Sequence, residues 1–415
     1  MNITKGNRLS AIIACTLAAS SGTLMAAGYK IPETSTNATA LSAAYVANAV
    51  GPDASYYNPA KMALDEDGGA IRGDLTYIHL PSVEYRGTQF GFPANDDSDK
   101  EDFLIPTMHY VSPYVGKARF GLSIVTPGGL SKQWHKWGAR SAEEFSLETI
   151  EVNPTAGYRL TDKLAIGGGV RMVYSKGKAK STVPNSIFRK MDGDSVDFGY
   201  NLALHFEPTE RLSLAATYRS KVDMTIEGDA ELGVGGGAVT LYDGSVSVDI
   251  PLPAALALAT AFDVTDRTTV EFVFERTYWS AYKDLDFNYG SPVPPPLVPF
   301  FDRPIPKDWK DSNTYRFGIT HQLNDKWTLM GGFALDKSPA PKSTVGFELP
   351  ESDGQIFSVG GRYEVSRQLE IDGGILYTKR DTLKLKPGEN DNGLVGEFKG
   401  AGALLVSIGA MYRFD

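Results

Sequence analysis

The residue types that most often carry out catalysis or bind metals are sparse in this chain. Its one cysteine, Cys15, falls in a segment expected to be removed, which leaves no thiol nucleophile, disulfide or zinc cluster in the mature chain. No Gly-x-Ser-x-Gly motif occurs, and no Gly-x-Gly-x-x-Gly motif stands between a strand and a helix. Five histidines are scattered without the spacing of a metal site: His79, His109, His135, His205 and His321. We therefore expect no enzyme, no metal and no cofactor.

Charge is the remaining chemistry, and its balance is acidic. The chain has 41 Lys and Arg residues against 50 Asp and Glu residues, which is not the composition of a nucleic-acid-binding protein. Lys5 and Arg8 precede a short apolar run and a cleavage position after Ala26, and this pattern predicts a signal peptide over 1–26. A lipoprotein signal ending at Cys15 is the alternative, but the apolar run before it is short.

Alternation of apolar and polar residues is the main pattern from about residue 68 to the end. In 402–414, every second residue from Leu404 to Phe414 is apolar, while Ser407 and Arg413 face the other way. Such segments have about ten residues, the length that a tilted strand needs to cross a bilayer. After the signal peptide no run of about 18 apolar residues predicts a transmembrane helix. A closed β-barrel is the other structure that pairs all its backbone groups in a membrane.

Fourteen such segments predict an all-β fold, a fourteen-stranded antiparallel transmembrane β-barrel over 68–415. Charged corners such as Thr161-Asp162-Lys163 make every second connection short, and the others are long, as in outer-membrane barrels with short periplasmic turns. Aromatic residues such as Tyr158 and Trp327 flank the short corners, as expected in the headgroup zone. The segments lie near 69–80, 103–113, 118–127, 145–159, 163–175, 195–206, 211–226, 245–262, 267–284, 312–322, 326–336, 354–364, 368–379 and 401–414.

The stretch before the first strand has a different composition. Residues 27–67 are rich in Ala, Ser and Asn, and they predict two short helices at about 38–49 and 59–64. A barrel of fourteen strands has a lumen too wide for its wall side chains to fill. We therefore interpret 27–67 either as a plug inside the barrel or as a periplasmic extension.

A set of longer motifs occurs in order along the chain: AGYKIPE from residue 27, DASYYNPAKMA at 53–63, TPGGL at 126–130, VNPTAGYRLTDKLAIGGGVRMVYSKGKAK at 152–180, LAATYRSKVDMTIEG at 214–228, TYWSAYKDLDF at 277–287 and WKDSNTYRFGITHQLNDKWTLMGGFALDKSPAPK at 309–342. This set resembles the outer-membrane transporters of long-chain fatty acids and hydrocarbons, the FadL/TodX (OmpP-like) type. Asn-Pro-Ala alone would be a weak signal, whereas the ordered set is specific. The resemblance covers essentially the whole mature chain.

The resemblance implies an N-terminal hatch that plugs the lumen, with its motif at Asn58, Pro59 and Ala60. It also implies an inward kink of the third strand, at Pro127, Gly128 and Gly129, where the ligand leaves sideways into the membrane. A proline without an N–H donor and two glycines suit a kink or a bulge. By position alone, the same three residues could simply begin the following loop.

A fatty acid is a carboxylate on an apolar tail, so the implied site is an apolar tunnel with one or two cations. The resemblance assigns the headgroup to Lys176 and Lys310, although alternation turns Lys176 toward lipid. The same alternation gives four inward-facing alternatives: Arg171, Arg219, Arg316 and Arg362. The other role open to these arginines is pairing with lumenal carboxylates: Asp197, Glu271, Glu275 and Asp372.

We thus expect a passive outer-membrane transporter of hydrophobic compounds, with long-chain fatty acids as the first ligand class and aromatic or alkane hydrocarbons as the alternative. A general diffusion porin and a surface adhesin are alternatives of a different class. The expected partners are a hydrophobic small molecule, outer-membrane lipid and the barrel-assembly machinery through the C-terminal strand, and no nucleic acid. Two features depart from the family pattern: the loop 179–194 is short, and Asp415 follows the terminal aromatic Phe414. The loop 291–309 is rich in Pro and aromatic residues, and it could collect a hydrophobic ligand or pack on the rim.

Overall fold

The computed structural model describes residues 28–65 and 68–414. The predicted signal peptide, 1–26, lies outside the described residues, and so does Asp415. Within the described part, a compact N-terminal segment precedes the first strand of the wall, β1 Ala70–Leu80. The wall therefore starts at Ala70, two residues after the start predicted for the barrel.

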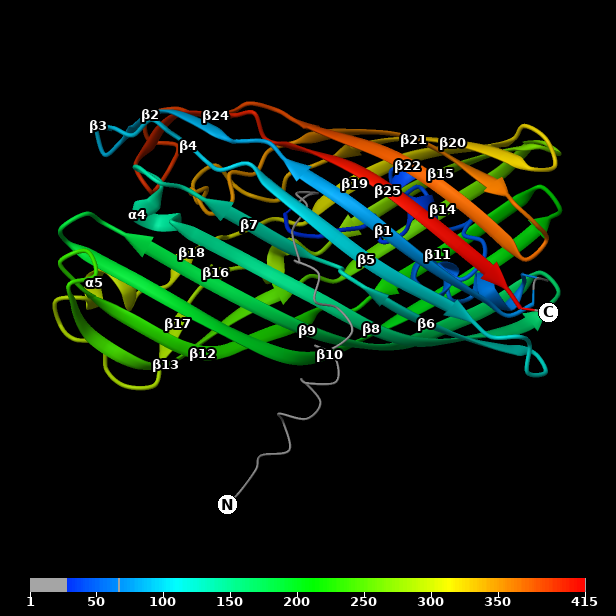
Figure 1. Cartoon of the computed structure of the whole chain (residues 1–415), viewed down its shortest axis with the longest axis horizontal. Coiled ribbons are helices and arrows are strands. Elements are labelled where there is room, and N and C mark those ends of the chain that lie inside the picture. Colours follow the sequence, from blue (N-terminus) through cyan, green and yellow to red (C-terminus); the bar gives the residue numbers. More distant parts are fainter. Residues whose placement is uncertain (1–27, 66–67, 415) are drawn as a thin grey trace, which may run out of the picture.

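The wall is a closed antiparallel β-barrel (Figure 1). Its single sheet contains 18 strand segments, four of which continue a strand beyond a local break, and this leaves the fourteen strands predicted from the sequence. The last strand pairs with the first from Ala70↔Arg413 to His79↔Leu404, which closes the barrel. In chain order the wall consists of β1, β5 Glu101–Val111, β6 Ala118–Val125 with β7 Gly129–Gln133, β8 Glu144–Thr161, β9 Leu164–Thr182, β10 Ile187–Thr209, β11 Leu212–Arg219 with β12 Val222–Val234, β13 Val239–Leu252 with β14 Ala255–Thr265, β15 Thr268–Thr277 with β17 Phe287–Tyr289, β19 Ser312–Gln322, β20 Trp327–Asp336, β21 Gly354–Glu364, β22 Leu369–Arg380 and β25 Gly402–Arg413.

The two faces of the wall have the opposite polarity to those of a water-soluble protein. In β1, Arg72 and Asp74 are buried inside the barrel, while Leu75 and Tyr77 are exposed on the outside. The aromatic residues beside the short turns, such as Tyr158 and Trp327, are also exposed. An apolar outer band with aromatic residues near its edge is the surface of a barrel surrounded by lipid.

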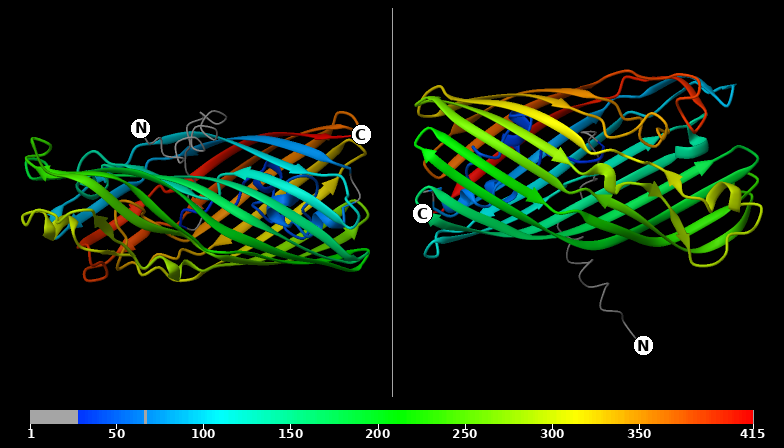
Figure 2. Two further views of the ribbon diagram at one scale, coloured as in Figure 1. Left: turned by 90° about the horizontal axis from the view of Figure 1, so that it is seen from below. Right: turned by 180° about the vertical axis from the view of Figure 1, so that it is seen from behind.

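The two ends of the barrel differ in the length of their connections. One end carries the short turns, and the other carries the long loops and the outermost parts of the strands (Figures 1 and 2). Two predicted loops are wrong in extent: β9 and β10 leave only 183–186 between them, and β12 and β13 leave only 235–238. These strand ends extend past the lipid band, where the outer face is no longer apolar, so hydrophobic alternation does not mark them.

The long-loop end contains additional small elements. A five-stranded sheet joins the first and last long loops: β2 Glu84–Gln89, β3 Phe92–Pro93, β4 Asp96–Asp97, β23 Leu383–Leu385 and β24 Leu394–Lys399. The other elements there are the pair β16 Asp284–Leu285 and β18 Ile305–Pro306, the helices α4 Ala139–Ala142 and α5 Val298–Phe301, and the 3₁₀ helix η2 Trp279–Ala281. None of the helices in the described residues has the length and apolar character needed to span a membrane.

The N-terminal segment lies inside the barrel, in the half nearer the short turns (Figure 2, blue). It contains α2 Thr36–Ala40, α3 Ala54–Tyr57 and the 3₁₀ helix η1 Lys61–Ala63. The predicted helix at 38–49 is therefore wrong beyond residue 40. The chain turns at Ser42 and Ala43, both with positive φ, and the next backbone N–H groups bond to a wall carboxylate instead of continuing a helix.

Candidate functional site

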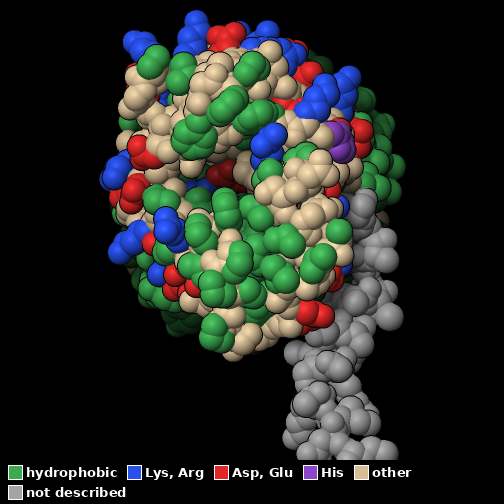
Figure 3. Space-filling model, turned by 90° about the vertical axis from the view of Figure 1, so that its left-hand side faces the viewer, with side chains coloured by type: hydrophobic (Ala, Val, Ile, Leu, Met, Phe, Trp, Pro, Cys, Tyr) green, Lys and Arg blue, Asp and Glu red, His purple; other side chains and the backbone are tan. Residues whose placement is uncertain are grey.

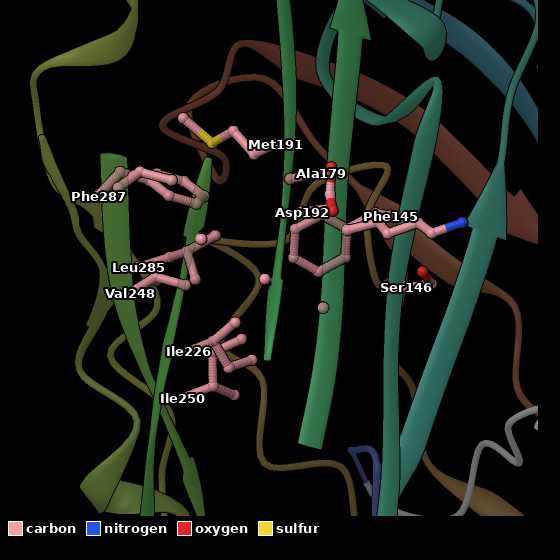
Figure 4. Close-up of a pocket in the computed structure, with 15 residues that line it drawn as sticks. Phe145, Ser146, Ala179, Met191, Asp192, Ile226, Val248, Ile250, Leu285 and Phe287 are labelled. Atoms are coloured by element: carbon pink, nitrogen blue, oxygen red, sulfur yellow. The ribbon is translucent and has the colours of Figure 1, made fainter. Parts of the chain in front are cut away.

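An inner apolar cavity of 40 Å³ lies in the half of the lumen nearer the long loops. Buried side chains from β8, β9, β10, β12, β13 and β17 converge on it (Figure 4). Those that line it with carbon are Phe145, Ala179, Met191, Ile226, Val246, Ile250 and Phe287. Because it offers carbon on nearly every side, the inner apolar cavity suits an alkyl or aryl group.

A larger mouth cavity of 340 Å³ opens toward the long loops and shares Phe145 and Leu285 with the inner apolar cavity. The predicted Pro-rich loop contributes Phe300, Phe301 and Ile305 to its lining. Figure 3 looks onto this end, where hydrophobic side chains surround an opening and Lys and Arg side chains stand on the rim. The two cavities are thus neighbours, and the mouth cavity is lined by charged as well as apolar side chains.

A third space, the kink cavity, lies deeper and measures 70 Å³. It brings together four of the residues singled out in the sequence: Pro127, Arg171, Arg219 and Arg316. The N-terminal residues Lys30 and Ile31 also line it. The kink cavity thus stands where the third strand, the N-terminal segment and a set of charged side chains meet.

The arginines of the kink cavity are bound to carboxylates. Arg171 lies 2.9 Å from a carboxylate oxygen of Glu151, and Arg219 donates a hydrogen bond to the other oxygen of the same carboxylate. Arg316 lies 3.6 Å from Glu275, which also accepts a hydrogen bond of 2.9 Å from Lys30. Lumenal pairing, the alternative role predicted for these arginines, is what their contacts show.

Sequence analysis named some partners correctly and missed others. Glu275 is a partner as predicted, whereas Asp372 pairs with Arg72. Glu271 accepts hydrogen bonds from backbone N–H groups of the N-terminal segment, and Asp197 accepts one from the Ser195 hydroxyl. Arg362 is half-buried and forms no ion pair with a described residue. Glu151 was missed, although the alternate positions Thr149, Glu151, Asn153 and Thr155 form a visible polar face.

Lys176 and Lys310 lie away from these cavities. Lys176 is exposed, and its inward-facing neighbours on β9, Val173 and Ser175, are buried. Lys310 is exposed next to the buried Trp309 at the long-loop end. Neither lysine lines the inner apolar, mouth or kink cavity, so their headgroup role has no supporting contact and stays a prediction.

A different cation, Arg189, lines the mouth cavity. The sequence prediction does not include it, because it falls in 179–194, the stretch predicted as a loop, where alternation assigns no inward or outward face. The signal was present in the sequence: Ile187, Arg189 and Met191 occupy alternate positions, so an arginine stands between two apolar residues on one face of β10.

The third strand is interrupted at the predicted kink. β6 pairs with β5 only from Met108↔Ile124 to Val111↔Gly121, and β7 pairs with β8 but not with β5. In this fully described part of the wall, no ladder pairing therefore joins 101–107 to 125–132. The wall has a gap in its backbone hydrogen bonds, and Thr126, Pro127 and Gly128 lie at its edge.

The N-terminal segment supplies the backbone partners that β5 does not. Ile31 N–H donates to the carbonyl of Pro127 at 2.9 Å, and Gly129 N–H donates to the carbonyl of Tyr29 at 2.7 Å. A Cβ on Gly128 would stand 2.8 Å from the carbonyl oxygen of Tyr29, so glycine permits this close approach. The kinked strand thus turns inward and pairs with the lumen rather than with its neighbour in the wall.

Side chains bridge the outer end of the gap. Ser131 donates a hydrogen bond to the carboxylate of Glu101, and the Lys132 ammonium lies 3.6 Å from it. All three side chains are buried. The gap is therefore closed by side-chain contacts, which can separate without breaking a β-ladder.

The Asn58-Pro59-Ala60 motif lies between α3 and η1, and Asn58 and Ala60 are fully buried. The Asn58 amide donates to the carbonyl of Val46 at 3.0 Å, and its oxygen accepts from Lys61 N–H at 3.3 Å. A Cβ on Gly167 would stand 2.5 Å from Ala60 N. The wall at β9 thus has room for this turn only because a glycine faces it.

Wall side chains hold the rest of the segment through its backbone. The Glu271 carboxylate accepts hydrogen bonds from three successive N–H groups, those of Val46, Ala47 and Asn48. Near the short turns, Arg119 donates to the carbonyls of Met62, Asp65 and Gly68. With contacts at its middle and at its C-terminal part, the segment is fixed to the barrel rather than loosely inserted.

Comparison with known proteins adds the context for this geometry. The chain matches the family described as outer membrane protein transport protein (OMPP1/FadL/TodX) over residues 17–414. The long-chain fatty acid transport protein of Escherichia coli (strain K12) is 23% identical over 384 residues, which cover 80% of this chain and 82% of that protein.

Solved structures show the same fold. A FadL homologue from Pseudomonas aeruginosa superposes with a TM-score of 0.81 at 21% identity and covers 94% of this chain and 100% of its own. The toluene transporter TodX of P. putida superposes with a TM-score of 0.70 at 17% identity, covering 92% of this chain and 98% of its own.

Proposed function

This chain belongs to the outer-membrane transport protein family OMPP1/FadL/TodX, which is a family of transporters rather than enzymes. On this basis we propose a specific route for its ligand. The protein is an outer-membrane β-barrel that transports hydrophobic compounds. In our proposal it takes up long-chain fatty acids passively. The ligand enters through the mouth cavity, moves into the inner apolar cavity and leaves sideways through the wall gap between β5 and β7.

The observation that carries this proposal is the wall gap beside a filled lumen. The N-terminal segment occupies the half of the lumen nearer the short turns and is held there by Glu271 and Arg119. An exit toward the short turns would require its displacement. At the gap no β-ladder has to break: Glu101 has to separate from Ser131 and Lys132, and the short backbone pairing of 29–31 with the kink has to shift. We therefore assign the hatch role to 28–65, with Asn58-Pro59-Ala60 as its central turn.

Lateral release also agrees with the energetics of an amphiphile. Each buried CH₂ group of the ligand is worth about 0.8 kcal/mol, so release into water would cost many times that amount for a long chain. Release into the bilayer avoids this cost, since the tail moves from one apolar surrounding to another. The glycines and proline of the kink make this the one place in the third strand where the ladder ends early.

Hydrocarbon uptake by the same route is the second candidate. The inner apolar cavity suits an aryl group as well as an alkyl chain, and the fold is shared with a protein named as a toluene transporter. A general diffusion porin agrees less well, because it needs an open aqueous lumen and this lumen contains the N-terminal segment. Contact with outer-membrane lipid, and with the barrel-assembly machinery through β25, belongs to the proposal as well.

The test is to straighten the third strand without changing the lining of the inner apolar cavity or the mouth cavity. A triple variant, Pro127→Val, Gly128→Thr and Gly129→Val, favours a continuous β5–β6–β7 ladder. We expect cells that carry it to lose oleate uptake, while the purified barrel still binds oleate. The outward-facing Gly73→Val, whose Cβ meets nothing within 4 Å, is the matched control. Unchanged uptake by the triple variant would remove the lateral route.

A further inference from the structure

Glu351 is a buried carboxylate with one oxygen left unpaired. It lies in the long loop between β20 and β21 and is 1% exposed. Its Oε1 accepts a hydrogen bond of 2.6 Å from Arg380, whereas its Oε2 has no hydrogen-bond partner among the described residues. An oxygen of a buried carboxylate without a partner costs free energy. Glu351 can therefore accept one further donor.

The charges around Glu351 are not balanced. Arg380 also lies 3.0 Å from Asp336, a buried residue at the end of β20. No second cation of the described residues lies within 4.0 Å of either carboxylate, so two acids share one guanidinium. Burial raises the pKa of Glu351 to about 8, although Arg380 lowers it in part, and Asp336 adds to the rise. The group lacks one positive charge.

The start of the described chain lies beside this carboxylate. The backbone N–H of Gly28 acts on Glu351 and lowers its pKa in part. Gly28 has a positive φ of 67°, and a Cβ on it would stand 2.5 Å from the ring of Trp279. The ring of the next residue, Tyr29, packs edge-to-face on Trp279 with centroids 4.8 Å apart. These contacts hold residue 28, and hence the chain end that precedes it, next to Glu351.

The predicted cleavage after Ala26 would make Ala27 the first residue of the mature chain. Residue 27 lies outside the described residues, but a trans peptide bond keeps its Cα about 3.8 Å from that of Gly28. A free α-amino group is largely protonated at neutral pH, whereas the same nitrogen in the uncleaved chain is a neutral amide. The next cation, Lys30, is engaged by Glu275 at 2.9 Å.

We propose that Glu351 binds the α-ammonium group of the mature N-terminus, which cleavage of the signal peptide after Ala26 creates. The inference rests on that predicted cleavage and is independent of the ligand in the proposed transport route. The ammonium supplies both the missing donor and the missing positive charge. It also anchors the chain just before Tyr29 and Ile31, whose backbones pair with the kink. Processing thereby completes a contact that the precursor cannot form.

The test measures how fast the α-amine reacts with a trace of acetic anhydride on the folded mature barrel in detergent micelles. Mass spectrometry of the N-terminal peptide identifies the first residue and its acetylation, and the exposed Lys176 is the internal reference. Only a neutral amine reacts, so an ion pair protects it. We expect the α-amine of the wild type to react about tenfold more slowly at pH 7 than that of Glu351→Gln.

Three further variants separate the ion pair from a loss of fold. Glu351→Asp keeps the charge and should retain part of the protection. A serine inserted between Ala26 and Ala27 moves the ammonium by one residue and should remove the protection while Glu351 stays intact. Asp353→Asn is the matched control, because Asp353 lies in the same loop but pairs with Lys337 at the surface. It should react as slowly as the wild type.

Four results would overturn the assignment. A mature chain that does not begin at Ala27 would place the ammonium elsewhere. Equal rates in the wild type and Glu351→Gln would show that the carboxylate does not bind it. Protection that persists in the chain extended by serine would reflect packing alone. Equal loss of protection in Asp353→Asn would reflect a general effect on the loop. None of these results bears on oleate uptake, so the proposed transport function is tested separately.

Discussion

The two halves of the lumen differ in what fills them. Toward the long loops, buried side chains are mainly apolar, and a continuous cluster includes Tyr85, Trp134, Ile226 and Phe347. Toward the short turns, the N-terminal segment fills the space, and wall residues such as Arg119 and Glu271 hold its backbone. One half therefore offers apolar surface, and the other is filled by a segment that the wall holds through its backbone; in our proposal the first binds the ligand and the second closes the barrel.

This difference locates specificity and impermeability in separate sets of residues. An apolar lining stabilises a ligand in proportion to the area that it buries. Ion pairs and charge-assisted hydrogen bonds stabilise one fixed arrangement, because a shift of either partner leaves a buried charge. The kink cavity, where Arg171, Glu151 and Pro127 lie near the end of the N-terminal segment, is the border between the two halves.

The largest expected effect comes from pushing the N-terminal segment out of the closed half. Gly167→Val would place a side chain where a Cβ already stands 2.5 Å from Ala60 N. We expect this clash to displace the turn at 58–60 and to raise the ionic conductance of the barrel in planar bilayers from near zero to a stable open level.

Two further variants keep this test informative. Gly157→Ala adds a Cβ that would stand 2.3 Å from the carbonyl oxygen of Pro59. We expect this clash to open the barrel in the same way. Gly73→Val faces outward with nothing within 4 Å and should stay closed. If both inward variants fold and remain non-conducting, the segment is not the closure.

The second effect compares a paired cation at the kink cavity with a cation of the other half, nearer the long loops, that has no carboxylate partner among the described residues. Arg171→Met leaves the buried Glu151 with Arg219 as its remaining cation, and we expect it to lower the free energy of unfolding by about 2–4 kcal/mol. Arg189→Met removes a charge that no carboxylate balances, so we expect a change below about 1 kcal/mol. Urea-induced unfolding in lipid vesicles measures both, and equal losses would show that the two arginines are structurally alike.

Sequence patterns predicted the strands of the wall better than the side chains and the segment that fill the lumen. Within the lipid band the outer face is apolar by necessity, so strands such as β25 follow from alternation alone. Beyond that band, the outer ends of β9 and β10 alternate among polar residues, and the same rule missed them. Arg189 lies in that stretch. For this reason the sequence patterns do not predict the cation that lines the mouth cavity.

The N-terminal segment shows a second limit. Its Ala-rich composition favours helix, and the helix was predicted to continue to residue 49. In the structure, the carboxylate of Glu271 on β15 accepts hydrogen bonds from the N–H groups of Val46 and Ala47, which are more than two hundred residues away in sequence. A hydrogen bond between residues so far apart in sequence overrides the local helix propensity, and nothing in the residues around 46–47 predicts it.

A smaller effect is expected from filling the inner apolar cavity. Ala179 lines it and is 4% exposed, so Ala179→Phe would occupy space that the tail needs. We expect the affinities for oleate and its uncharged ester, methyl oleate, to fall together by about fivefold to tenfold. Val196→Phe, on the exposed face of β10, is the control. A loss confined to oleate would mean that the cavity does not hold the tail.

The smallest expected effect is a pH dependence at the border of the two halves. Glu33 lies on the N-terminal segment, two residues after Ile31, and burial raises its pKa from 4.5 to about 7, although Arg316 at 4.0 Å lowers it in part. Asp336 and Glu275 raise it further. The protonated acid is therefore favoured in the folded state, and the stability that it contributes is lost as pH rises from about 4.5 through about 7.

This loss should be seen in the backbone pairing of 29–31 with the kink. After correction for intrinsic rates, we expect amide hydrogen exchange at Ile31 and Gly129 to be several-fold faster at pH 8 than at pH 5. Glu33→Gln cannot ionise, so it should exchange slowly at both pH values. If the wild type shows no pH dependence, or if Glu33→Gln retains it, the charge of Glu33 does not weaken the contact that holds the kink inward.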